Sequence, residues 1–76
     1  MRTHEYVVCL NDDLWEVCLN GRLLSAQPTR REALNVADIL AHGAALRGQR
    51  SKILADIVDG RGTVELPTIE PEAQGA

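Results

Sequence analysis

Few residues of this 76-residue chain have side chains suited to catalysis or metal binding. Neither His4 nor His42 stands near a nucleophile in a spacing typical of Ser-His-Asp or Cys-His catalysis. Cys9 and Cys18 lack the Cys-x-x-Cys or paired-histidine neighbours of a zinc site. Because no secretion signal precedes them, we expect both cysteines to be reduced, small hydrophobic residues. The sequence therefore predicts no enzyme, no metal site, no cofactor and no small-molecule substrate.

The basic side chains suggest a different chemistry, which is the binding of phosphate groups. The net charge of −3 disfavours non-specific binding to polyanions. Residues 22–61 nevertheless carry seven basic and four acidic side chains, a local balance of +3. Five of these basic residues flank a predicted helix, and a two-fold axis would double them: Arg30, Arg31, Arg47, Arg50 and Lys52. They are the candidate nucleic-acid contacts; the alternative is an ordinary solvated rim.

The elements that must position these residues belong to one small domain. A chain of this length forms a single domain with a marginal core, and Tyr6 and Trp15 are its only aromatic residues. Hydrophobic residues make up 45% of the chain, which is typical of a folded protein. No apolar run approaches the roughly 20 residues of a membrane span, and the start lacks the apolar stretch of a signal peptide. We therefore expect a cytoplasmic protein with no membrane partner.

The first third of the chain predicts three antiparallel strands. Residues 5–10 (EYVVCL) and 14–19 (LWEVCL) are β-type runs joined by the turn-forming Asn11-Asp12-Asp13. Asn20-Gly21 then separates the second run from a third at 22–26, and this dipeptide favours a two-residue hairpin turn. The expected arrangement is a three-stranded antiparallel meander.

A helix should follow the meander. Thr29 can cap it and Glu32 completes the capping-box pattern, while Gly48 is a natural stop after about Leu46. At helical spacing one face carries small and apolar residues, which would let the helix lie close to the sheet: Ala33, Val36, Ala37, Leu40, Ala41 and Ala44. Ile39 and Leu46 form a second apolar patch outside that face.

The end of the chain is less regular. Residues 51–58 (SKILADIV) fit either a helix or a strand entering a turn; we favour a strand, with a return strand at 63–66. From Pro67 onward two prolines and acidic residues favour disorder. The predicted fold is an α+β domain over residues 1–66, with a disordered tail at 67–76. It comprises a three-stranded antiparallel meander packed on one helix, followed by one or two short strands, and is dimeric.

The expected dimer follows from the two faces of the predicted sheet. A turn centred on Asp12-Asp13 places Tyr6, Val8, Leu10, Trp15, Val17 and Leu19 on one face, which Leu24 and Ala26 join. The opposite face shows Val7, Cys9, Glu16, Cys18, Leu23 and Ser25, where polar residues would be usual. Either a second subunit or the C-terminal hairpin should cover it. The predicted dimer interface comprises Val7, Cys9, Cys18, Leu23, Ile39 and Leu46.

The meander and helix start also resemble known domains over about residues 5–47. The pattern is Trp15-Glu16-Val17, Asn20-Gly21-Arg22, Ser25 and Thr29-x-x-Glu32-Ala33. It resembles small uncharacterised bacterial domains with a Trp-x-Val hairpin followed by a helix. It is more distantly similar to the three-stranded-sheet-plus-helix DNA-binding domains of phage-type integrases and plant ethylene-response factors. The integrase resemblance implies DNA contact through basic residues of the exposed sheet face, and the corresponding face here has none.

Two functions remain open from the sequence. The leading hypothesis is a non-enzymatic, homodimeric binding or regulatory module that acts through protein association. The alternative is a regulatory dimer that binds DNA through the arginine clusters at the two helix ends.

Overall fold

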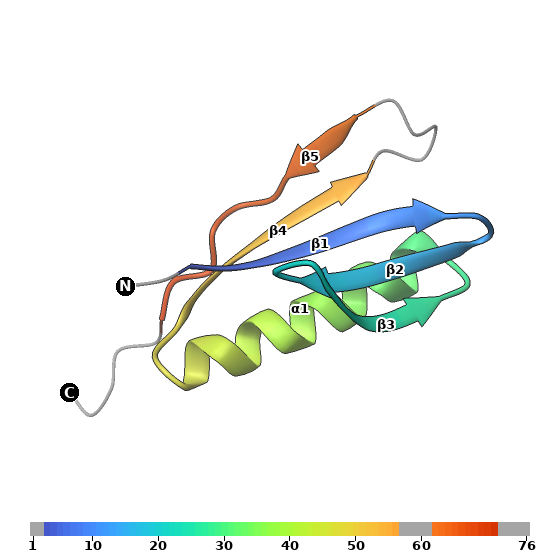
Figure 1. Ribbon diagram of the computed structural model, residues 1–76. Helices are drawn as coiled ribbons and strands as arrows, with labels where there is room; N and C mark the ends of the chain where they lie inside the picture. Colours follow the sequence, from blue (N-terminus) through green and yellow to red (C-terminus); the bar gives the residue numbers. More distant parts are fainter. Residues whose placement is uncertain (1–2, 57–61, 72–76) are drawn as a thin grey trace.

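The computed structural model describes residues 3–56 and 62–71 (Figure 1). Over these residues it contains one helix and one five-stranded sheet. The elements are β1 (Thr3–Asn11), β2 (Leu14–Leu19), β3 (Arg22–Gln27), α1 (Arg30–Leu46), β4 (Arg50–Asp56) and β5 (Thr63–Glu65). The strand order is β3-β2-β1-β4-β5, and α1 lies across one face of the sheet (Figure 1). The α+β prediction is confirmed.

The meander forms as its turn residues predict. Asn11 pairs with Leu14, so the first turn centres on Asp12-Asp13. In the second turn Asn20 has φ of 53° and Gly21 has φ of 83°. Positive φ at both positions is the type I′ geometry that Asn-Gly favours, because its twist matches that of the flanking strands.

The third strand departs from the prediction because of a β-bulge. The register between β2 and β3 shifts between Val17 and Cys18, so Leu24 has no partner in the ladder. Beyond the bulge Ser25 pairs with Val17 and Ala26 with Glu16, which exchanges the faces expected for these two residues. Of the remaining predicted core positions, Leu10 is 40% and Leu24 is 43% exposed.

Helix α1 has the predicted caps and the predicted buried face. Thr29 Oγ1 accepts a hydrogen bond from the Glu32 amide at 3.1 Å. At the other end the Gly48 amide donates to the Ala45 carbonyl and the Gln49 amide to the Ala44 carbonyl, which is a Schellman arrangement. The helix buries mainly alanines against the sheet: Ala33, Ala37, Ala41, Ala44 and Ala45. The core under them consists chiefly of Tyr6, Val8, Trp15, Val17, Ile53 and Ala55.

The segment after the helix is a strand, so the helical alternative for residues 51–58 is wrong over its described part, 51–56. Burial alternates along β4, with Ser51, Ile53 and Ala55 buried. Residues 57 and 58 lie outside the described residues. The strand pairs in parallel with β1, which no local pattern predicted, since parallel partners require a long crossover. The return strand β5 pairs antiparallel with β4, as expected.

Residues 67–71, expected in a disordered tail, have defined positions along β4. Ser51 and Ile69 exchange two backbone hydrogen bonds, of 2.9 and 2.7 Å. Arg50 Nε also donates to Glu70 Oε1 at 2.9 Å. The edge of β4 attracts this segment because its amides and carbonyls need partners. Residues 72–76 lie outside the described part of the chain.

Helix α1 has neither the length nor the apolar character needed to cross a membrane, and it is the one helix that the described ranges contain.

The two glycines near the end of α1 allow a matched test of the helix stop. Gly48 has φ of 81°, so Gly48→Ala should lower the free energy of unfolding by about 1–2 kcal/mol. Gly43 lies inside the helix, where an added Cβ meets only Arg47 Nη1 at 3.6 Å. Gly43→Ala should raise the free energy of unfolding by about 0.5–1 kcal/mol. Urea unfolding measures both; a stabilising Gly48→Ala would contradict the described cap.

Candidate functional site

The face of the sheet opposite α1, here called the open face, is the candidate functional surface. Side chains alternate along each strand, so the register places every second residue of each strand on it. One line of neighbours across four strands is entirely apolar, apart from the weak polarity of a thiol: Leu23, Cys18, Val7 and Leu54. We call this line the apolar row. Leu23 is 55% exposed, and the other three are half-buried.

A second line of neighbours lies beside the apolar row, toward the first turn. It comprises Ala26, Glu16, Cys9, Asp56 and Thr63. Asn11 Nδ2 donates to Glu16 Oε2 at 3.2 Å. Asp56 accepts from the Leu10 amide at 3.2 Å and from Thr63 Oγ1 at 3.4 Å. The only charged side chains in this line are the two carboxylates, Glu16 and Asp56, and hydrogen bonds hold both in place.

The two cysteines meet on this face. The Sγ atoms of Cys9 and Cys18 and a carboxylate oxygen of Glu16 all lie within 4.8 Å of one another. Both thiols are free and half-buried. Burial raises the pKa of the Cys9 thiol, and the neighbouring Cys18, Asp56 and Glu16 raise it further. Strand pairing thus brings the two cysteines, which have no short metal motif in the sequence, together with a third possible ligand.

The predicted dimer residues fall on two separate surfaces. Val7, Cys9, Cys18 and Leu23 lie on the open face. Ile39 and Leu46 are 67% and 60% exposed on α1. Ile39 follows the buried Ala33 by six residues, which is about 240° around the helix, so it points away from the sheet. The six residues cannot belong to one continuous interface.

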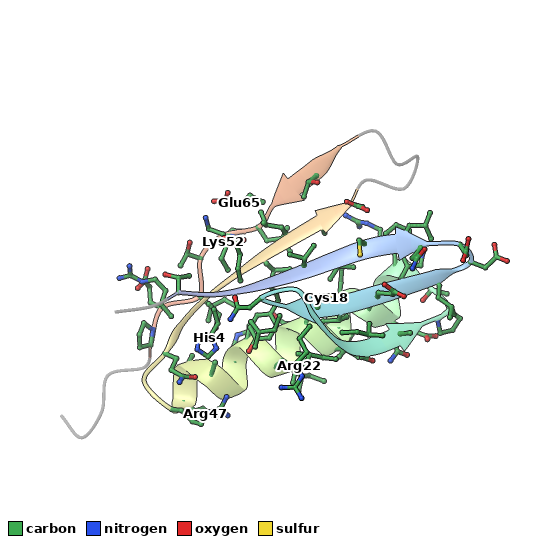
Figure 2. All side chains as sticks on the ribbon, in the orientation of Figure 1. His4, Cys18, Arg22, Arg47, Lys52 and Glu65 are labelled. Atoms are coloured by element: carbon green, nitrogen blue, oxygen red, sulfur yellow. The ribbon has the colours of Figure 1, made fainter. Side chains whose placement is uncertain are left out.

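The five basic residues do not form one cluster either. Arg30 Nε donates to the Asp56 carbonyl at 2.9 Å and so ties the helix start to the end of β4. Arg50 forms an ion pair with Glu70, and Lys52 Nζ lies 3.6 Å from Glu65 Oε1. Figure 2 shows Lys52 and Glu65 together on the β4–β5 side and Arg47 at the end of the helix. Arg31 and Arg47 stand at opposite ends of α1, about 24 Å apart along its axis.

A hollow of about 270 Å³ lies on the other side of the sheet, between α1, β4 and the segment after β5. Its lining combines apolar and polar side chains: Arg31, Leu34, Asn35, Asp38, Ile53 and Leu66. This lining includes no cysteine, serine or histidine that could act as a nucleophile or a general base.

Comparisons of the chain with protein-family models, with curated proteins and with solved structures find no match.

Two features of the open face were missed by sequence reasoning. With the turn centred on Asp12-Asp13, Cys9 falls opposite Glu16, and Cys18 is one diagonal step away. The register of the first hairpin therefore predicts the cluster. A search for short metal-binding motifs misses it, because the cysteines lie on different strands. Leu54 joins the apolar row only through the parallel pairing of β4 with β1, for which no local signal exists.

The reactivity of Cys9 tests the charge environment of the open face. Glu16→Gln removes one of the groups that raise the pKa of Cys9, so the fraction of thiolate at neutral pH should rise. We expect faster alkylation of Cys9 by iodoacetamide, followed by peptide mass spectrometry. Glu5→Gln, a control elsewhere on the same face, should leave the rate unchanged. A Glu16→Gln variant that reacts no faster would contradict this account.

Proposed function

We propose that this chain is a small non-enzymatic binding or regulatory module that forms a homodimer through the open face. The observation that supports the proposal is the apolar row, Leu23, Cys18, Val7 and Leu54, which crosses four strands. A sheet face in contact with water normally alternates to polar residues, and a continuous apolar line is typical of a covered face.

The chain's own described segments leave this face uncovered. Helix α1 occupies the opposite face, and its alanines and the sheet's large residues close the core there. The C-terminal hairpin, which could have folded back over the open face, instead extends the sheet beside β1 (Figure 1). The sequence suggested that either a second subunit or the C-terminal hairpin covers this face, and this arrangement favours a second copy of the chain.

The apolar row suits a symmetric partner, because one copy of the row can stack on another. The charges beside the row do not select the orientation, because Lys52 is paired with Glu65 and Arg50 with Glu70, while Glu16 and Asp56 are both acidic. A two-fold axis parallel to the row places each side of the row in one copy against the opposite side of the row in the other copy. The two apolar rows then stack on each other and are removed from water.

Dimerisation is tested with one variant on each of the two apolar surfaces. Leu23→Lys places a charge in the apolar row, and we expect it to convert the dimer to a monomer in sedimentation velocity. Ile39→Lys is the matched control on the outer side of α1, and it should remain dimeric. Both residues are more than half exposed, so each change should alter the free energy of unfolding by no more than about 0.5 kcal/mol.

Two results would contradict the proposed interface. One is a wild-type protein that stays monomeric at tens of micromolar. The other is a dimer that Ile39→Lys dissociates and Leu23→Lys does not, which would move the interface to the helix.

The alternative, DNA binding, has less support from the same structure. Phosphate contacts supply most of the affinity of such modules, and three of the five candidate residues have protein partners, namely Arg30, Arg50 and Lys52. We therefore expect no binding to random-sequence duplex DNA even at low salt. Binding that weakens steeply with salt and is lost in the Arg31→Ala/Arg47→Ala variant would favour the alternative instead.

A further inference from the structure

The Cys9–Glu16–Cys18 cluster on the open face has the donor atoms of a metal site. Glu16 and Cys18 are separated by one residue on β2 and so project from the same face. Cys9 on β1 lies directly opposite Glu16. Two sulfurs and one carboxylate oxygen thereby converge from two hydrogen-bonded strands, which hold their backbones in a fixed register. All three donor atoms lie within 4.8 Å of one another.

We propose that Cys9, Cys18 and Glu16 bind a thiophilic divalent ion of the zinc class. Zinc bonds to thiolate at about 2.3 Å in a tetrahedron, which requires its ligand sulfurs to lie about 3.8 Å apart. The spacing in the cluster exceeds that value by no more than about 1 Å, and rotation of side chains can close this difference. Three protein ligands and one water complete a tetrahedral site.

The donor set also determines which ions fit. Thiolates select zinc, copper(I) and similar soft or borderline ions, whereas calcium and magnesium prefer sites made of oxygen atoms alone. The single carboxylate favours a divalent ion over copper(I), which prefers sulfur ligands throughout.

The charges around the cluster favour a cation. Among the described residues, the apolar row and the line beside it hold two carboxylates, Glu16 and Asp56, and no basic side chain, and Glu65 pairs with Leu54 at the end of the row. Lys52, in the next line, is already paired with Glu65. Once the cysteines ionise, this region carries several negative charges that a bound divalent ion would offset.

A disulfide is the competing use of two neighbouring thiols, and the strand register disfavours it. Cys18 lies opposite Val7, so Cys9 and Cys18 are diagonal neighbours. Diagonal positions on adjacent strands lie about 7–8 Å apart, and disulfides rarely bridge Cα atoms separated by more than about 6.8 Å. A metal ion spans the pair without moving the backbone, because it adds two bonds between the sulfurs.

All three protein ligands come from one chain, so the metal site needs no second copy, although Cys18 also belongs to the apolar row. We expect one ion per chain, whatever the oligomeric state. Measuring the metal stoichiometry and the sedimentation coefficient on the same samples separates the two proposals. A monomer that binds one ion would support the site and contradict the dimer.

Cobalt(II), which replaces zinc and absorbs visible light, is the probe for the first experiment. Titration into the reduced protein without oxygen should produce the absorption of tetrahedral cobalt together with sulfur-to-cobalt charge transfer. Zinc should then displace the cobalt and abolish both signals. Zinc should also raise the thermal midpoint of unfolding as its concentration increases, because it binds only the folded cluster.

Variants assign the ligands. Cys9→Ser and Cys18→Ser should each weaken the charge-transfer band, since one sulfur ligand remains, and lower cobalt affinity by more than the roughly 10- to 100-fold typical of losing an outer-sphere partner. Glu16→Gln should weaken binding and leave the sulfur band in place. Glu5→Gln, a carboxylate of the same face outside the cluster, should bind like the wild type. Circular dichroism of each variant confirms that the fold is retained.

Three outcomes would overturn the proposal. The first is a titration without the tetrahedral cobalt spectrum. The second is binding that survives both cysteine substitutions. The third is a reduced protein that takes up no ion and loses both thiols together on mild oxidation, which would assign the pair to a disulfide.

Discussion

The structure depends on one contact, the packing of an alanine-rich helix face against large side chains of a sheet. Ala33, Ala37 and Ala41 are fully buried, and they let the helix backbone approach Tyr6 and Trp15 closely. Alanine contributes little apolar area, so the sheet must supply most of the hydrophobic stabilisation. Both aromatic residues are consequently committed to this single layer. A chain so short of large apolar residues has none to spare for a second core, yet it keeps an apolar row on the open face.

The contrast between a sparse core and an uncovered apolar row connects the fold with the proposed binding function. The hydrophobic residues of the open face cannot be explained by the core, since the helix and the C-terminal hairpin both lie elsewhere. A second copy and a metal ion would each bind only the folded state, and so each would stabilise a marginal domain. The two proposals share Cys18 on one surface but depend on different properties, one on apolar area and the other on donor atoms.

The sequence predicted what local interactions determine and missed what distant contacts determine. The meander followed from Asn20-Gly21, and the helix from Thr29 and Gly48, because turn and cap preferences act within a few residues. The position of β4 beside β1 depends on a crossover through the whole helix, and the bulge that turned Ser25 inward has no distinct local signal. Arg30 looked like a surface charge, since its partner, the Asp56 carbonyl, is 26 residues away.

The segment after β5 has a consequence for assembly. It pairs through Ile69 with the first part of β4, and β5 itself is only three residues long and is followed by Pro67. At the other edge of the sheet, β3 carries the bulge. Short strands, prolines and bulges all hinder the addition of another chain to a sheet edge. With both borders protected in this way, growth of the sheet into open-ended fibres is hindered, and association is directed to the faces, where it can end with two copies.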